Sequence, residues 1–86
     1  MIASVVNVST TATLLVAATA NATRTIYLEP VGTDVHIGGS AVTTTTGLVT
    51  KKDVVTSILL PPKNALYAIT AAGTVDVRIL QPTGDF

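Results

Sequence analysis

The sequence predicts an all-β fold, a small antiparallel β-sandwich or flattened barrel of about seven to nine short strands. Three observations support this class. Threonine and the β-branched aliphatic residues are abundant, and they favour pleated, half-buried surfaces. Apolar and polar residues alternate with a period of two, most regularly over residues 74–79. Glycine, proline and asparagine recur as turn signals, and no stretch has the periodicity of an amphipathic helix.

Two segments share a pattern that we interpret as two related β-hairpins. In residues 65–81 apolar and polar side chains alternate after a turn at Gly73, which tolerates positive φ. Residues 26–37 repeat the order of strand, Gly-Thr turn and Asp-Val-basic-Ile strand. We therefore expect one hairpin in each sheet. The side chains expected to face the core are Val35, Ile37, Val75, Val77 and Ile79.

The segments nearer the N-terminus predict short strands. Residues 2–8 predict a short strand or an extended arm. Residues 13–17 are apolar on both faces, and the β-rich surroundings favour a strand over a helical turn. In the next strand Ile26 and Leu28 face inward. Pro30 lies at a strand end or on a sheet edge, because proline cannot donate to a ladder.

The segments between the two hairpins are less regular. Residues 41–46, with their run of threonines, predict a flat edge strand or a loop crossing between sheets. Residues 48–50 could pair locally, and residues 51–53 form a charged turn. Residues 54–60 are apolar on both faces, which is typical of a strand that is central or covered twice. Residues 61–64 end that strand in a proline-rich turn.

The chain has 86 residues, the length of a single domain spanning residues 1–86. Within it, residues 1–9 form an N-terminal arm or edge strand and residues 82–86 a C-terminal tail. A folded chain of this size buries only about 63% of its unfolded surface. It has no cysteine and therefore no disulfide. Oligomerisation is the remaining route to extra stability.

The composition supports oligomerisation. Charged residues make up 12% of the chain and hydrophobic residues 48%, whereas soluble chains are typically about 25% charged. We expect a homo-oligomer in which other subunits cover apolar surface. The formal net charge is zero, so nothing favours binding to nucleic acid or to anionic membranes. No apolar run approaches the roughly 18 residues of a membrane span.

The N-terminal segment and the last residue are the candidate interface. Residues 1–9 carry apolar side chains on both faces and no charged side chain, so a free arm would offer an unpaired strand to another chain. The alternative is an ordinary edge strand of the same subunit. The residues expected at the interface are Ile2, Val5, Val6, Val8 and Phe86.

Chemical sites are poorly supported by the residues present. Asp34 and His36 stand two apart and share a strand face, a spacing that could supply two metal ligands. No second histidine and no cysteine completes such a site, so a solvated outer face is the favoured reading. The chain has one histidine but no Gly-x-Ser-x-Gly motif that would supply a nucleophilic serine beside it. Gly38-Gly39-Ser40 lacks the lysine of a phosphate-binding loop. We expect no enzymatic activity, no cofactor and no metal.

The aromatic residues are few. Tyr27 and Tyr67 occupy equivalent positions in the two predicted hairpins. We expect them to fill the core with hydrogen-bonded hydroxyls rather than to form a sugar-stacking surface.

Three stretches carry a family resemblance, namely residues 11–24, 34–39 and 65–80. They resemble short virion-associated proteins of tailed bacteriophages, and the resemblance spans most of the chain. It implies a small β-sandwich of the kind found in head decoration or cement proteins, which often sit on a capsid as trimers. Other such proteins belong to tails or fibres. The family has no catalytic residues to transfer, and residues 51–53 depart from the glycine-containing turn expected there.

The resemblance implies a phage virion structural protein that binds the head surface as an oligomer, most often a trimer, and stabilises it. Its partners would be further copies of itself and the major capsid protein or another virion protein. It would be made in the bacterial host cytoplasm and reside on the capsid surface. The alternative is a tail- or fibre-associated β-module that recognises a host surface glycan or protein. Exposed aromatics or an acidic pocket would favour the alternative, and a flat apolar base with an extended arm would favour the capsid role.

Overall fold

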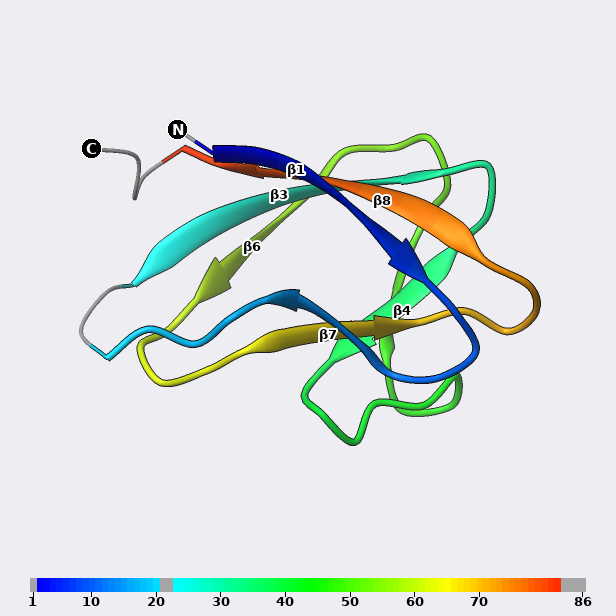
Figure 1. Cartoon of the computed structure of the whole chain (residues 1–86), viewed down its shortest axis with the longest axis horizontal. Helices are drawn as coiled ribbons and strands as arrows, with labels where there is room; N and C mark the ends of the chain where they lie inside the picture. Colours follow the sequence, from blue (N-terminus) through cyan, green and yellow to red (C-terminus); the bar gives the residue numbers. More distant parts are fainter. Residues whose placement is uncertain (1, 21–22, 83–86) are drawn as a thin grey trace.

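The computed structural model describes residues 2–20 and 23–82 and confirms the all-β class (Figure 1). This part of the chain forms eight strands and no helix, hence no helix that could cross a membrane. The strands are β1 (Ile2–Val8), β2 (Thr13–Val16), β3 (Arg24–Val31), β4 (Val35–Gly38), β5 (Leu48–Thr50), β6 (Thr56–Leu60), β7 (Leu66–Ile69) and β8 (Val75–Gln81). They form two four-stranded antiparallel sheets that enclose one core, so the fold is a β-sandwich.

The strand order identifies the topology. Sheet A has the order β1-β8-β3-β6 and sheet B the order β2-β7-β4-β5. The first strand therefore pairs with the last, the second with the seventh, the third with the sixth and the fourth with the fifth. The chain is arranged as one long hairpin that is folded over on itself. The β3–β8 and β4–β7 pairings then join the strand pairs into two four-stranded sheets. This arrangement is a jelly roll.

The two segments predicted as hairpins are not hairpins. β3 lies in sheet A and β4 in sheet B, so the turn at Gly32 crosses between the sheets. β7 and β8 also lie in different sheets and are joined through Gly73. Period-two alternation shows that a strand has one buried face. The same alternation results whether the next strand pairs beside it in one sheet or packs across the core in the other sheet, so the pattern does not distinguish the two. Gly73 does adopt the positive φ expected of it (68°), and Gly32 does the same (86°).

The sequence repeat nevertheless has a counterpart in the topology. Advancing every strand by four positions converts the order of sheet A into that of sheet B read backwards. β3 and β7 are thereby equivalent, as are β4 and β8. Ile26 and Leu66, which match in the repeat, are both buried. The repeat thus describes two crossings between the sheets, which pair with each other through β3–β8 and β4–β7.

The predicted core residues are confirmed. Each of the five is at most 3% exposed, and Ile26 and Leu28 are buried as expected. They pack with residues from six other positions along both sheets, including Val8, Leu15 and Leu60. The inward side chains of β3 and β8 alternate with outward ones throughout, so sheet A has one buried and one open face.

Arg24 closes one end of the sandwich. It begins β3 on the inward side and is only 7% exposed. Its Nη2 donates to the carbonyl oxygen of Ala17 at 2.9 Å, and its Nη1 donates to Oε1 of Gln81 at 3.5 Å. Hydrogen bonds of this kind offset part of the cost of burying a guanidinium.

Residues 54–60 do not form a central strand. β6 lies at an edge of sheet A, where it pairs with β3 alone. Leu59 points outward and is 65% exposed, while Leu60 is buried in the core. The prediction of a central strand is therefore wrong, and no described residue covers the outer side of Leu59.

The threonine-rich segment is a loop that joins β4 to β5 within sheet B. The hydroxyl of Thr43 accepts hydrogen bonds from the backbone N–H groups of Thr45 and Thr46, which fold the loop into a tight turn. Gly47 ends the turn and donates its N–H to the carbonyl of Thr43 at 2.9 Å.

A buried charge on β8 should abolish the fold. Val77 is fully buried in the central part of sheet A, and an unpaired carboxylate there costs more than a small domain can offset. We expect Val77→Asp to lose its cooperative thermal transition in circular dichroism at neutral pH. Val49→Asp, at a residue that is 45% exposed, is the control and should keep it. Unchanged melting of Val77→Asp would mean that the register of β8 is wrong.

Gly47 should tolerate no side chain. A Cβ there would lie 2.6 Å from the Cβ of His36 and 2.8 Å from Cγ2 of Val42. Overpacking of this kind costs about 1–3 kcal/mol, so Gly47→Ala should lower Tm by roughly 4 °C or more. Gly39→Ala is the matched control, because a Cβ on Gly39 meets nothing within 4 Å. Equal melting temperatures for the two variants would contradict the packing of this loop.

Candidate interaction surface

The outer face of sheet A carries an apolar surface that no other described segment covers. Outward side chains from all four strands meet there in register. Leu80 on β8 lies opposite Ala3 on one side and Tyr27 on the other, and Leu59 is diagonal to Tyr27 across the β3–β6 pair. We define the sheet A patch as Ala3, Val5, Tyr27, Val55, Leu59 and Leu80.

The patch is exposed to an unusual degree for aliphatic side chains. Val5 is 60%, Val55 61% and Leu59 65% exposed, and Tyr27 is 37% exposed. Part of the patch surrounds a shallow hollow of about 480 Å³, into which Glu29 and Arg78 also extend. Contiguous apolar surface of this kind makes the patch a candidate interaction site.

The charged residues of the hollow are paired with each other. Nη1 of Arg78 lies 3.8 Å from Oε1 of Glu29 on the neighbouring strand. Their side chains are 66% and 34% exposed, so the pair contributes only about 0–1 kcal/mol to stability. It leaves the hollow without net charge, and an apolar partner is favoured over an ionic ligand.

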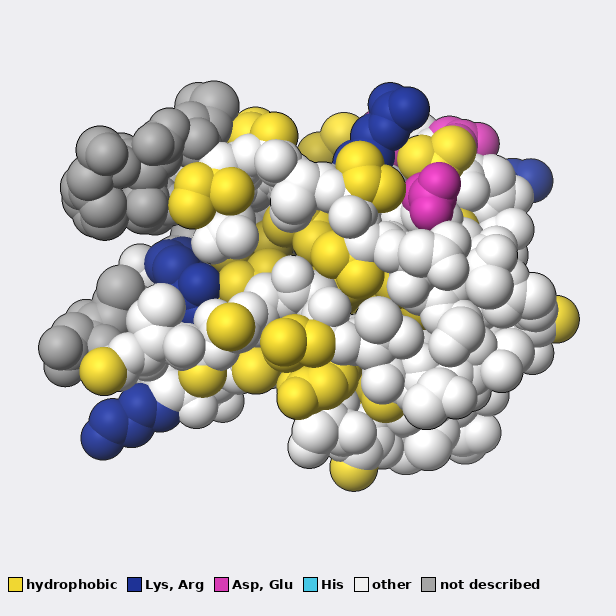
Figure 2. Space-filling view, viewed as in Figure 1, with side chains coloured by type: hydrophobic (Ala, Val, Ile, Leu, Met, Phe, Trp, Pro, Cys, Tyr) yellow, Lys and Arg dark blue, Asp and Glu magenta, His cyan; other side chains and the backbone are white. Residues whose placement is uncertain are grey.

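The face of the molecule seen in Figure 2 is also poor in charge. Figure 2 shows that charged side chains are few and spread apart on the face that carries the edge strands β1 and β2. Apolar side chains reach the surface in a band between these strands. Leu14 on β2, for example, is 44% exposed.

The interface residues predicted on the N-terminal segment divide into two groups. β1 is the edge strand of this chain's own sheet A and pairs with β8 along its whole length, as in the edge-strand alternative. Val8 is fully buried and Val6 packs against the core, so both belong to this subunit's interior. Ile2 and Val5 are 41% and 60% exposed. Contact with a neighbour stays a prediction for these two, and Phe86 lies outside the described residues.

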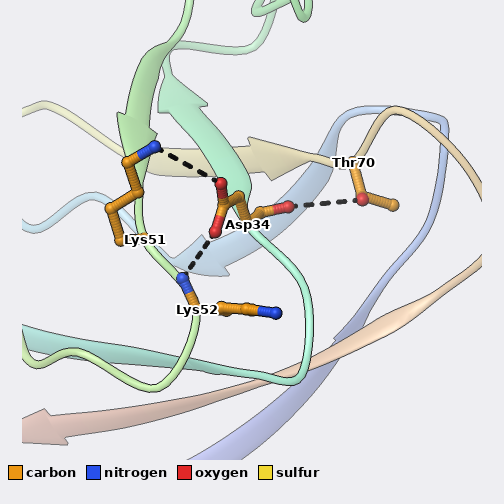
Figure 3. A network of polar contacts seen from close by, with 4 residues as sticks. All are labelled: Asp34, Lys51, Lys52 and Thr70. Carbon is orange, nitrogen blue, oxygen red and sulfur yellow. Dashed lines mark hydrogen bonds and ion pairs between the residues drawn. The ribbon is translucent and has the colours of Figure 1, made fainter.

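Asp34 joins two connections between the sheets (Figure 3). Its Oδ1 accepts a hydrogen bond from the backbone N–H of Lys52 at 2.7 Å, and its Oδ2 lies 3.7 Å from Nζ of Lys51. Its carbonyl oxygen accepts a hydrogen bond from the hydroxyl of Thr70 at 3.4 Å. Asp34 therefore holds the β3–β4 connection against the segment between β5 and β6 and against the end of β7.

Asp53 makes a second contact between the same connections. Its N–H donates to the carbonyl of Pro30 at 2.7 Å, and its Oδ1 accepts from the N–H of Gly32 at 3.2 Å. Asp53 has φ 57°, a left-handed conformation that aspartate tolerates better than most residues. It takes the left-handed conformation that a glycine would otherwise supply in this turn.

Asp34 and His36 together line a second hollow, separate from the one beside the sheet A patch, as the spacing of the two residues predicts. Lys52 and Thr70 also line this second hollow. No group of three or more metal-binding side chains occurs in the described parts of the chain. The carboxylate of Asp34 is bound by Lys51 and Lys52. We infer that Asp34 has a structural role.

The expectation that both tyrosines fill the core is wrong. Tyr27 is 37% exposed on the outer face of sheet A, and Tyr67 is half-buried at the equivalent outward position of β7. Alternation with the buried residues Ile26 and Leu28 was the signal that could have placed Tyr27 outside. The apolar residues on both faces of β6 indicated that one of these faces needs a cover. Only the strand order shows that β6 lies at an edge of the sheet, where Leu59 is exposed.

Comparisons of the chain with protein-family models, with curated proteins and with solved structures found no match.

The contacts of Asp34 should make the stability of the fold depend on pH in the acidic range. The hydrogen bond from the backbone N–H of Lys52 holds the pKa of Asp34 below its ordinary value of 3.8. Desolvation opposes this shift, and the charge on Lys51 lowers the pKa further. A lowered folded-state pKa stabilises the fold above the unfolded value and loses that contribution as pH falls through the folded value.

We therefore expect wild type to lose more stability than Asp34→Asn when pH is lowered from about 5 to below 3.8. Asparagine keeps an acceptor for the Lys52 amide but binds no proton. Urea unfolding of both proteins across this range measures the difference. Parallel pH profiles would contradict the role assigned to Asp34.

Proposed function

We propose that this chain is a structural protein of a bacteriophage particle, a decoration or cement protein that binds the head surface as an oligomer and stabilises it. The observation that carries the proposal is the sheet A patch, which exposes three aliphatic side chains by 60% or more in a chain with only 12% charged residues. The partners are further copies of the chain and the major capsid protein or another virion protein.

The patch can contribute to binding through the hydrophobic effect, which is non-directional. Fully burying a valine or leucine side chain contributes about 1.5–3 kcal/mol. Val5, Val55 and Leu59 are already partly covered, so a partner gains on the order of 1–2 kcal/mol from each. A flat protein surface can collect this energy over the whole patch, whereas a small substrate cannot. The proposed role is therefore assembly and not catalysis.

The fold is compatible with the proposal without deciding it. Jelly rolls occur in viral capsid and lectin domains, and a fold of this kind hosts many functions. The sequence resemblance to virion-associated proteins adds support for the capsid role. The apolar face favours that role too, although residues 2–8 lie in the sheet as β1 and do not form an extended arm.

A tail or fibre module that recognises a host glycan or protein is the second candidate. Tyr27 favours it, because this aromatic side chain lines the hollow beside Glu29 and Arg78. Sugar rings stack on aromatic faces and hydrogen-bond to neighbouring polar groups. One half-exposed tyrosine is a small stacking surface, and the aliphatic majority of the patch favours the first candidate.

The experiment uses the phage that carries this gene, grown with the gene intact and with it deleted. We expect the chain in purified particles by mass spectrometry, and on the head surface in cryo-EM maps. Particles without it should release DNA at a lower temperature, and adding the purified chain should restore the original temperature. Density on the tail or fibres would support the second candidate instead. Absence of the chain from purified particles would overturn both.

A further inference from the structure

Sheet A has two open edges, and neither is protected. β1 is seven residues long and pairs with β8 residue by residue without a bulge. β6 is five residues long at the opposite edge. Neither strand contains a charged residue or a proline. Edge strands normally carry such features, because their free N–H and C=O groups otherwise pair with another chain.

The edges of sheet B are less available for pairing. β2 has four residues, and its register with β7 shifts between Leu14 and Val16. β5 has only three residues and is followed by Lys51 and Lys52. A short or irregular edge offers few ladder hydrogen bonds. The two open edges suited to strand addition thus belong to the same sheet.

The strand directions make these two edges complementary. Every neighbouring pair in sheet A is antiparallel, so in its four-strand order β1 and β6 run in opposite directions. β1 of one copy can therefore extend the sheet of another copy beyond β6 as a further antiparallel strand. The inward and outward faces of both sheets then stay on the same sides.

The side chains at the two edges fit the same arrangement. Val5 is the exposed outward residue of β1 and Leu59 that of β6, at 60% and 65% exposure. Pairing β1 with β6 brings both into one outer face across the junction and makes the sheet A patch continuous between copies. It also accounts for the apolar character of β6 on both faces. Pairing β1 with a second β1 would cover Val5 but leave Leu59 and β6 open.

We propose that copies of this chain assemble head to tail, with β1 of each copy hydrogen-bonded to β6 of the next. The partner is a second copy of the chain, so this inference rests on the oligomeric part of the proposed function and specifies its interface. A contact between two different surfaces closes into a ring when the rotation between copies allows it. The trimer implied by the family resemblance is such a ring.

The first test places a lysine at each edge. Val5→Lys and Leu59→Lys put charge at the junction while both side chains remain outside the core. Light scattering at micromolar concentration should give an oligomer for wild type and the 8.8 kDa monomer for each variant. Leu48→Lys is the matched control, since Leu48 is 65% exposed on β5 at the edge of sheet B. It should remain oligomeric, and circular dichroism checks that all the variants fold.

The second test distinguishes head-to-tail pairing from self-pairing. In the double variant Val5→Lys/Leu59→Glu, head-to-tail pairing sets the introduced lysine near the introduced glutamate of the next copy, and the oligomer should return. Pairing of β1 with β1 sets lysine against lysine, so the double variant would stay monomeric and the proposal would fail.

Two further results would overturn the interface. One is a wild type that is itself monomeric, and the other is an oligomer that persists in both single-lysine variants. Neither result bears on whether the chain is found on phage heads, which the particle experiment measures separately.

Discussion

The structure depends on the pairing of β3 with β8, two strands that are separated by half of the chain. Their register runs from Tyr27 opposite Leu80 to Val31 opposite Asp76. The inward side chains of the two strands, including Ile26, Leu28, Val77 and Ile79, form much of the core. Because β8 and β3 occupy the middle of sheet A, β1 and β6 are left at its edges. The same pairing thus creates both the interior and the surface to which we assign function.

Once β3 and β8 are paired, short connections must cross from one sheet to the other. Gly32 and Gly73 supply positive φ at two of these crossings. Asp34 then fastens the β3–β4 crossing to the β5–β6 crossing by accepting the backbone N–H of Lys52 (Figure 3). Asp53 fastens the same two crossings through the carbonyl of Pro30 and the N–H of Gly32. These contacts satisfy main-chain groups in turns that no sheet ladder reaches. Asp34, Lys51, Lys52, Asp53 and Lys63 lie in connections. Among the described residues, the outer face of sheet A carries three charged residues, Glu29, Asp76 and Arg78, of which Arg78 and Glu29 are paired with each other.

This distribution of charge connects the fold with assembly. A single chain satisfies its inner faces with one compact core but leaves apolar side chains on the outer face of sheet A. With few charges and no cross-links, the domain gains stability mainly by covering surface. In the proposed role, binding to a larger particle covers the face, and in the proposed assembly, pairing between copies covers the edges. The two modes use different parts of one sheet and are compatible with each other.

The sequence by itself determined the aliphatic core residues of the regularly alternating strands and the turns at Gly32 and Gly73. Alternation placed Val35, Val77 and their neighbours in the core, because a strand with one buried face has a period of two. It did not determine which strands pair, since the same alternation serves a hairpin and a crossing between sheets. The tertiary structure alone decided that residues 26–37 and 65–81 cross the sandwich, that the strand carrying Tyr27 is central in sheet A, and that β6 lies at an edge. The physical reason is that burial is a local property of each strand, whereas an edge, a patch or an interface depends on contacts between residues distant in the chain.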